Sequence, residues 1–392
     1  IAGNVFQDPR SQFFANEVVG EVAFGCENYG YSHEEIRNHV HRAAADIKIQ
    51  DILDHSLHSL SYGMRQKVAI ASAEAIDPEI YVMDEPSANL DIASTYRFAD
   101  IIRELKQQGK TIIIAEHRLY YLMDLANRFL CVQKGKIVRE FTAQQMKALT
   151  NQEIQALGLR TPDLHQIEQT EISSAATSEV VLEVKKLNHS FGETIVAKNI
   201  DFQCRQGEVI ALIGPNGTGK STIGRILAGL LKEKSGEVIL FGKHCRPKSR
   251  LGKVWYIPQD LDSQLFGEDL LDELTTGSEV SPERKQAAEE ILEALELTPF
   301  LKQHPSTLSG GQKQRLALMH EAPIIILDEP TSGLDGTNMR NVSQMIRKLA
   351  KMRRTIIVIT HDAECALACC ERAIRLENGC ITDDFQIRGA EI

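Results

Sequence analysis

The chain has 392 residues, of which 43% are hydrophobic and 25% are charged. This composition is typical of a folded globular protein, and the length suffices for two or three domains. The formal net charge of −10 argues against a broad surface that binds nucleic acid without sequence preference. No apolar run approaches the roughly 20 residues of a membrane-spanning helix, so we expect any membrane role to be peripheral.

Cysteine usage indicates a reducing compartment. Eight cysteines are present, with no CxxC pair and no spacing typical of a disulfide framework. No secretory signal is visible. Cys365, Cys369 and Cys370 fall at helical spacing, and we expect small buried residues there rather than a metal cluster.

Two distant segments of the chain resemble each other. Residues 1–6 are expected to end a strand that leads into QDPRSQFF at 7–14, and residues 254–258 lead into QDLDSQLF at 259–266. Further pairs are SLSYGMRQK at 59–67 with TLSGGQKQR at 307–315, IYVMDEP at 80–86 with IIILDEP at 324–330, and TIIIAEH at 111–117 with TIIVITH at 355–361. Self-similarity at so long a period indicates duplication, so the chain is predicted to contain two copies of one domain.

Apolar, β-branched runs alternate with helical patterns, for example at 95–108 and 282–297. This alternation predicts α/β domains with largely parallel, buried strands. The predicted first domain covers residues 1–143 and the second covers 180–392. Residues 144–159 are expected to form one short amphipathic helix, and the polar stretch 161–179 reads as a linker, so 144–179 separates the domains.

The segment GPNGTGKST at 214–222 matches GxxxxGK followed by Ser or Thr, and it lies between an apolar run and a helical pattern. Its glycines allow backbone N–H groups to turn inward, and the helix beginning near Lys220 directs its positive end to the same point. Lys220 is expected to reach the phosphates of a nucleotide, and Ser221 to bind Mg²⁺ through its hydroxyl. The residues expected to hold the nucleotide are Gly214, Asn216, Gly217, Gly219, Lys220, Ser221 and Thr222. The alternative is a Gly-rich turn without a ligand, which the other motifs disfavour.

On these motifs the chain resembles a tandem nucleotide-binding subunit of the ATP-binding cassette superfamily, over nearly all of its length apart from the linker. The Gln-Asp-x-x-x-Gln-apolar-Phe segments further resemble the energy-coupling-factor branch, which takes up vitamins and metal ions in prokaryotes. The resemblance implies two tandem P-loop NTPase domains, each with a largely parallel sheet and a helical subdomain. It also implies ATP and Mg²⁺ as ligands.

Phosphoryl transfer to water needs a phosphate cradle, a metal and a group that activates the water. Asp328 closes an apolar strand and is expected to bind Mg²⁺ through its water shell, while Glu329 would turn elsewhere and act as general base. In the family, the residue matched by His361 contacts the γ-phosphate, and the residue matched by Gln259 senses the γ-phosphate and Mg²⁺. The first copy has its own set, which consists of Gln7, Asp84, Glu85 and His117.

The segment LSGGQ at 308–312 matches the family's signature, which caps the γ-phosphate held by the opposite domain through backbone N–H groups and a Ser hydroxyl. The resemblance implies Ser309, Gly310, Gly311 and Gln312 for this role. It also implies that the site of Lys220 faces Ser61 and Gly63 of the first copy. There Tyr62 replaces a glycine, so either Tyr62 points away or the loop sits differently, and we hypothesise slower hydrolysis.

The complementary site would use Asp84, Glu85 and His117 with the second signature. Lys220 precedes Gln259 by 39 residues, so the matching lysine of the first copy falls about 32 residues before Ile1. With no initial Met, we expect a truncated N-terminus and no normal ATP binding at this site. The second copy is also four residues shorter between its signature serine and its aspartate. This difference is either one absorbed helical turn or an omission from the sequence.

Two further features bear on ligands and partners. Phe191 matches the family's aromatic residue that stacks on adenine, with a core phenylalanine as the alternative. Glu21, Asp272 and Glu273 follow the Gln segments, where the family forms a groove for helices of a transmembrane subunit. These acids would pair with its arginines, or else lie on a solvated helix face.

The resemblance implies an ATP-hydrolysing subunit that energises uptake of a vitamin or metal ion, at the cytoplasmic face of a prokaryotic membrane. Its expected partners are a transmembrane coupling subunit and a separate substrate-binding membrane protein, with the two cassettes pairing and no nucleic acid bound. One alternative is a tandem cassette that acts on ribosomes or nucleic acid. Such factors tend to carry a long charged helical linker, whereas 161–179 is short and not basic. A purely structural role is the other alternative.

Overall fold

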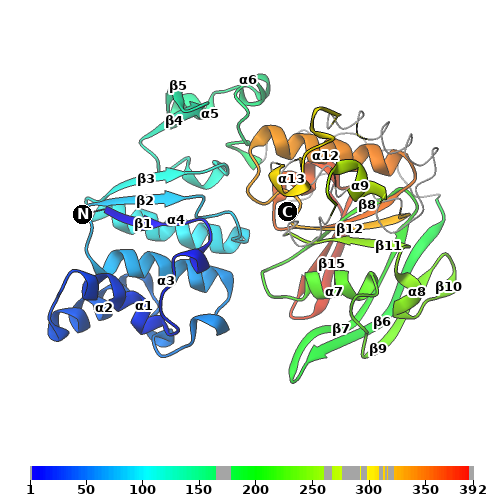
Figure 1. The fold of residues 1–392 in the computed structure, drawn as a ribbon, viewed down its shortest axis with the longest axis horizontal. Coiled ribbons are helices and arrows are strands. Elements are labelled where there is room, and N and C mark those ends of the chain that lie inside the picture. Colours follow the sequence, from blue (N-terminus) through cyan, green and yellow to red (C-terminus); the bar gives the residue numbers. More distant parts are fainter. Residues whose placement is uncertain are drawn as a thin grey trace. The chain divides into compact units, whose positions relative to one another are not determined.

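The computed structural model describes residues 2–164, 178–259, 267–275, 292, 298–308, 312, 313, 316 and 322–387. The chain divides into two compact units, Ile1–His165 and Gln166–Ile392, which are described separately below as the first and second unit (Figure 1). None of the described helices is both long enough and apolar enough to cross a membrane. The domain boundaries at 143 and 180 stay predictions.

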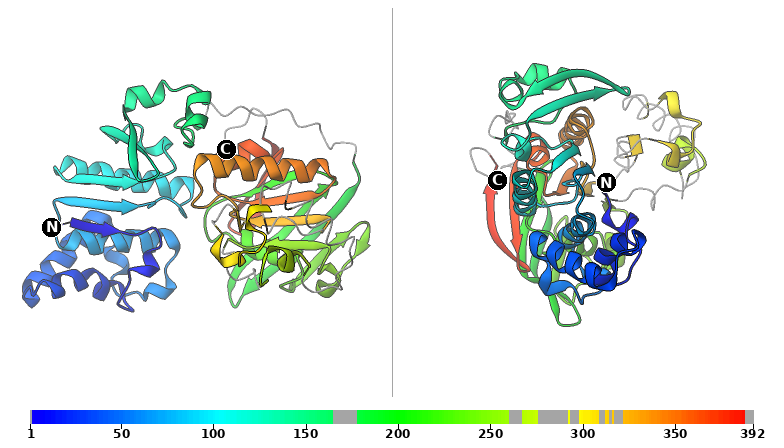
Figure 2. Two further views of the ribbon diagram at one scale, coloured as in Figure 1. Left: turned by 45° about the horizontal axis from the view of Figure 1, so that its top comes forward. Right: turned by 90° about the vertical axis from the view of Figure 1, so that its left-hand side faces the viewer.

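The first unit contains a three-stranded parallel sheet, a two-stranded hairpin and a group of helices. Its strands and α-helices are β1 (Ala2–Val5), α1 (Val18–Asn28), α2 (His33–Ile47), α3 (Tyr62–Ala75), β2 (Ile80–Asp84), α4 (Ile92–Gln107), β3 (Thr111–Ala115), β4 (Arg128–Gln133), β5 (Lys136–Thr142), α5 (Ala143–Lys147) and α6 (Asn151–Ala156). The sheet has the order β1-β2-β3, and β4 pairs with β5 antiparallel. Figure 2 shows α1, α2 and α3, in blue, gathered on one side of these strands.

The second unit contains two larger sheets. Its strands and α-helices are β6 (Val180–Phe191), β7 (Thr194–Arg205), β8 (Val209–Ile213), α7 (Lys220–Leu227), β9 (Ser235–Leu240), β10 (Lys243–His244), α8 (Pro247–Arg250), β11 (Val254–Ile257), α9 (Leu270–Thr275), β12 (Ile324–Asp328), α12 (Gly336–Lys351), β13 (Thr355–Ile359), α13 (Ala363–Cys369), β14 (Arg372–Glu377) and β15 (Cys380–Gln386). One sheet has the order β10-β9-β6-β7 and is antiparallel. The other has the order β11-β12-β13-β8-β14-β15 and is parallel except at β14-β15.

Helices cover both faces of the six-stranded sheet, as Figure 1 shows for α7 and α12. Alternate residues of a strand point to opposite faces. In β8, Val209 and Ala211 accordingly join the core that contains residues of α12, whereas Ile210 and Leu212 join the core that contains residues of α7. Because both faces are covered, all residues of β8, β12 and β13 are buried. The predicted α/β class with two tandem P-loop domains is confirmed.

Three helix predictions have different outcomes. The helix expected at 95–108 starts earlier, at Ile92, because the Asp91 carboxylate accepts the Ser94 backbone N–H at 2.7 Å and caps it. The single helix expected at 144–159 is wrong, because Thr150 and Glu153 form a capping box that starts α6 separately from α5. The helix expected at 282–297 lies outside the described residues apart from Leu292.

The cysteine prediction is confirmed as far as burial is concerned. Cys365, Cys369 and Cys370 are at most 4% exposed and lie in the core of the second unit. Their thiols pack against one another, with 3.9 Å between the sulfurs of Cys365 and Cys369. Burial raises the pKa of the Cys370 thiol.

Candidate nucleotide-binding site

The predicted phosphate loop connects β8 to α7, and its backbone requires glycine. Gly214 has φ +139° and Gly219 has φ +98°. A Cβ atom would lie 2.1 Å from the Leu376 carbonyl oxygen at Gly214, and 2.3 Å from the Val196 carbonyl oxygen at Gly219. Neither approach is possible for a residue with a side chain, so the glycines define the path of this loop.

Lys220 is the first residue of α7 and is 6% exposed. Its ammonium donates to the carbonyl oxygens of Gly214 and Pro215, at 2.7 and 2.8 Å. The cation is therefore held inside the curve of the loop. A charge in this place, beside a helix N-terminus, fits the phosphates of a nucleotide.

Asp328 ends β12 and is buried, and the hydroxyl of Tyr256 donates to its carboxylate. Burial raises the pKa of Asp328, while the hydrogen bonds of the Tyr256 and Ser221 hydroxyls oppose that rise. The structure thus brings Ser221 and Asp328 together, as predicted for a metal site. Hydroxyl and carboxylate oxygens are hard donors that suit Mg²⁺.

Glu329 follows Asp328 with φ +52°, and its backbone N–H donates to the Ile359 carbonyl at 2.8 Å. This turn directs its side chain to the end of the neighbouring strand β13. There Nδ1 of His361 lies 2.7 Å from Oε1 of Glu329, and the Thr360 hydroxyl donates to Oε2 at 3.1 Å. The expected general base and the expected γ-phosphate contact are therefore direct neighbours. Gln259 follows β11, the strand that pairs with β12, and its amide donates to the Ser332 hydroxyl at 3.3 Å, in the turn after Glu329.

The first unit repeats part of this arrangement. Glu85 has φ +40°, and its backbone N–H donates to the Ala115 carbonyl at 2.8 Å. Nε2 of His117 lies 3.2 Å from Oε1 of Glu85, and the Gln7 amide donates to Oε2 at 2.9 Å. The structure therefore brings Gln7, Glu85 and His117 together, whereas Asp84 is exposed.

Ser61 caps α3, since its hydroxyl accepts the Met64 backbone N–H at 3.4 Å. Gly63 lies in the first turn of this helix. The Tyr62 hydroxyl donates to the Gln7 carbonyl, so its side chain turns toward the Gln segment of its own unit. In the second signature, Ser309, Gly310 and Gly311 lie outside the described residues, and Gln312 is partly buried.

The three acidic residues after the Gln segments accept backbone N–H groups, and Asp272 is exposed, as the alternative of a solvated face predicts. Glu21 is 2% exposed, and its carboxylate accepts the N–H groups of Phe14 and Ala15 at 2.8 and 3.0 Å. Glu273 likewise accepts the Gly267 N–H at 2.6 Å. The alternative of a solvated face is therefore wrong for Glu21, whose carboxylate holds the preceding loop, and pairing of these acids with a partner's arginines stays a prediction.

Phe191 ends β6 and is 55% exposed, with its ring edge to face against His189 at 4.9 Å. The alternative of a core phenylalanine is therefore wrong. Stacking of its ring on adenine stays a prediction.

Sequence reasoning missed Tyr256 and Arg118. Tyr256 reaches Asp328 only because β11 and β12 are neighbours in the sheet, and the sequence signal is merely a tyrosine three residues before Gln259. Arg118 is 7% exposed and donates to the carbonyls of Ser87, Ala88 and Leu90, which follow Glu85 in the chain. Its signal is a basic residue directly after His117, where the second copy has Asp362.

Comparison with known proteins identifies the family. The ABC transporter family model matches residues 2–88 and 197–332. A putative ABC transporter ATP-binding protein of Treponema denticola is 39% identical over an alignment of 398 positions, which covers 100% of this chain and 81% of the relative. The putative HMP/thiamine import ATP-binding protein YkoD of Bacillus subtilis is 29% identical, over 93% of this chain and 72% of the relative.

Among solved structures, a model of ribosome-bound archaeal Pelota and ABCE1 matches with a TM-score of 0.72 and 25% identity, over 99% of this chain and 65% of that chain. It shares the tandem cassette fold. The phosphate loop, the acidic strand ends and the sequence relatives agree with one another. The chain belongs to the ABC transporter family of ATP-binding proteins.

Proposed function

We propose that the chain is an ATP-hydrolysing subunit that energises a membrane transporter of the energy-coupling-factor type, which imports a vitamin or a metal ion. The observation that carries the ATPase part is the placing of Glu329 against His361, 2.7 Å apart, beside the Ser221 and Asp328 pair. The similarity to a relative named as an HMP/thiamine import protein supports the import part.

Each site residue of the second unit has a role in this proposal. Lys220 and the loop backbone hold the β- and γ-phosphates, and Ser221 and Asp328 hold Mg²⁺. When bound, Mg²⁺ neutralises phosphate charge and orients the γ-phosphate. Glu329 accepts a proton from the water that attacks the γ-phosphorus, while the bond from the γ-phosphorus to the β–γ bridging oxygen breaks and ADP leaves. His361 fixes the carboxylate of Glu329 on one side, and Thr360 fixes it on the other.

Gln259 and Phe191 have proposed roles that rest on the family resemblance, in γ-phosphate sensing and in adenine stacking. We also propose that the two cassettes pair on ATP binding. The proposed partners are a transmembrane coupling subunit and a small substrate-binding membrane protein, which places the chain at the cytoplasmic face of the membrane.

The test is to tag the chain in its host, solubilise membranes gently and identify the proteins that co-purify. Recovery of a transmembrane coupling protein with a small substrate-binding membrane protein supports the proposal, and the latter's ligand names the solute. Absence of the chain from membranes contradicts the transport part. Glu329→Gln serves as a trap, because slowed hydrolysis is expected to preserve an ATP-dependent complex.

A second candidate is a factor that acts on ribosomes. The match to the ribosome-bound ABCE1 model over 99% of this chain favours it. The net charge of −10 and the similarity to proteins named as transporter subunits speak against it. Co-sedimentation of the chain with ribosomes at physiological salt, together with its absence from membranes, would establish this candidate over the first.

A further inference from the structure

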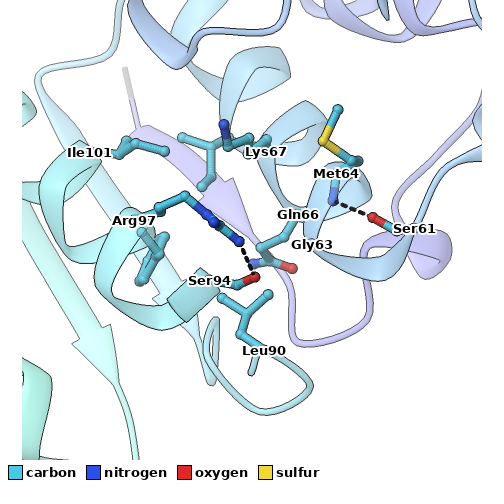
Figure 3. Close-up of a pocket in the computed structure, with 11 residues that line it drawn as sticks. Ser61, Gly63, Met64, Gln66, Lys67, Leu90, Ser94, Arg97 and Ile101 are labelled. Atoms are coloured by element: carbon cyan, nitrogen blue, oxygen red, sulfur yellow. Dashed lines mark hydrogen bonds between the residues drawn. The ribbon is translucent and has the colours of Figure 1, made fainter. Parts of the chain in front are cut away.

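A cavity of about 280 Å³ lies between α3 and α4 of the first unit (Figure 3). It begins at the N-terminus of α3, where Ser61 and Gly63 of the first signature line it, and continues along that helix to Ile70. No residue of the phosphate loop contributes to it. Its lining consists of Ser61, Gly63, Met64, Gln66, Lys67, Ile70, Leu90, Ser94, Arg97, Phe98 and Ile101.

Gln66 of α3 is part of the wall of this cavity and lies next to Gly63 and Ser94, as Figure 3 shows. It is 1% exposed, and within the described part of the chain neither its amide nitrogen nor its amide oxygen has a hydrogen-bond partner. A buried amide without hydrogen-bond partners is unfavourable, because the loss of its hydration is not compensated. Such groups in folded proteins are normally satisfied, so Gln66 points to a bound polar molecule.

The charges around the cavity indicate the sign of the charge on that molecule. Lys67 and Arg97 both line it, and neither forms an ion pair with a carboxylate among the residues that the structure describes. Arg97 donates instead to the Ser94 hydroxyl at 2.9 Å. Burial lowers the pKa of Lys67, and the charge of Arg97 lowers it further. Two mutually repelling cations favour an anion between them.

The other lining residues indicate that part of the bound molecule is apolar. Ile70, Phe98 and Ile101 are each at most 5% exposed and line the cavity beside the two cations. The N-terminus of α3, a helix of 14 residues, adds backbone N–H groups at the other end. The second copy has Asn341 at the position of Arg97, so this set of charges belongs to the first copy.

We propose that the cavity between α3 and α4 binds a small organic anion, with its carboxylate or phosphate at Lys67 and Arg97. Gln66 hydrogen-bonds the polar part of the ligand, and its apolar part packs on Phe98 and Ile101. Ser61 and Gly63 of the first signature line one end of this cavity, whereas the proposed anion contacts, Lys67 and Arg97, are not among the residues expected to hold the nucleotide.

The test measures binding of benzoate and of the neutral, isosteric benzamide to the full chain by ligand-observed NMR, with inorganic phosphate as competitor. Saturable benzoate binding is expected, with benzamide at least tenfold weaker. Displacement of benzoate by phosphate would identify phosphate esters as the natural class, and failure of displacement would identify carboxylates. Arg97→Asn, which copies the second cassette, and Lys67→Met are each expected to weaken benzoate at least tenfold.

Two controls keep the result interpretable. Arg103→Asn removes a cation of α4 that does not line the cavity and pairs with Asp100, and it should leave benzoate binding unchanged. Lys220→Ala should lose ATP and keep benzoate, so failure of the ATPase proposal and failure of this one are distinguishable. Thermal unfolding verifies that each variant is folded. No saturable benzoate binding to the unaltered chain, or equal affinity in folded Arg97→Asn and Lys67→Met variants, overturns the proposal.

Discussion

The central strands of the two units have similar sequences but different surroundings. In β12 all five residues are buried, whereas in β2 Tyr81 and Met83 are buried and Ile80 and Val82 are each 40% exposed. The difference lies in α7, which covers one face of the second sheet. Gly224 of α7 allows this contact, since a Cβ atom there would lie 2.9 Å from the side chain of Ile359.

This comparison links stability to function. The helix that buries the second face of the sheet is also the helix that begins at the phosphate loop. Within the described residues of the first unit, no equivalent helix covers Ile80, Val82 and Ile113. In the second unit one helix therefore supplies both the cover of a parallel sheet and part of the cradle for phosphate.

The turns after the acidic strand ends differ in charge. In the second unit Thr331 donates to Asp362 at 2.6 Å, next to His361. In the first unit Ser87 donates to Glu116 at 2.6 Å, and Arg118 donates to three carbonyls of the same turn. Asp362 thus contacts this turn in the second unit, whereas Arg118, at the equivalent position, contacts it in the first unit. Both units keep the pair of a glutamate and a histidine beside the turn.

The largest expected effect separates the two glutamates. Glu329→Gln is expected to lower ATP turnover by about 10²- to 10⁴-fold, because it removes the general base. Glu85→Gln is the matched control and should change turnover less than about threefold, because its unit has no phosphate loop among the described residues. Steady-state phosphate release measures both. Equal losses in the two variants would show that the units contribute alike.

The second expected effect concerns the covered and uncovered sheet faces. Ile357→Ala should destabilise its unit by about 2–5 kcal/mol, because the side chain is 2% exposed in a packed core. Ile113→Ala, at the equivalent position, should cost less than about 1 kcal/mol, because that side chain is 56% exposed. Urea unfolding measures both values. A large cost at Ile113 would mean that this face is covered in solution.

Glu74 of α3 gives a pH-dependent effect. Burial raises its pKa from 4.5 to about 7, and the Tyr81 hydroxyl donates to it. Since the folded state binds the proton of Glu74 more tightly than the unfolded state does, protonated Glu74 adds to the free energy of unfolding. This addition is fully present below pH 4.5, is lost as the pH rises through 7, and amounts to about 3 kcal/mol at most. Glu74→Gln should flatten the pH dependence of urea unfolding between pH 5 and 7. An unchanged slope in the variant would refute this assignment.

The smallest expected effect is at the first signature. Tyr62→Gly, combined with Met64→Gln, should raise ATP turnover by about two- to fivefold if Tyr62 hinders approach of backbone to phosphate. Tyr62→Phe removes only the hydrogen bond to the Gln7 carbonyl and is the control. A rate in the double variant equal to that of Tyr62→Phe would sink the hypothesis of a slow site.

Features that depend on local sequence were predictable. The glycine positions of residues 214–219 follow from the motif, and the neighbouring of Glu329 and His361 follows from two adjacent parallel strands that end together. The Tyr256 contact with Asp328 was not predictable, because it depends on which strands pair.

The surroundings of Glu21 could not be read from the sequence, since an acid in a first helical turn has the same pattern whether it faces solvent or binds a preceding loop. The break between α5 and α6 was missed because apolar periodicity outweighed the capping signal of Thr150.

The most direct test of the central claim is nucleotide binding at the phosphate loop of the second unit. Equilibrium titration of the full chain with a fluorescent ATP analogue and Mg²⁺ should show a tight site. Lys220→Ala should weaken that site by roughly 100-fold or more, because two or more charge-assisted hydrogen bonds to phosphate are lost. Lys232→Ala, an exposed lysine of the same unit, should bind as the unaltered chain does. Tight binding retained in Lys220→Ala would contradict the assignment of the nucleotide site to the second unit.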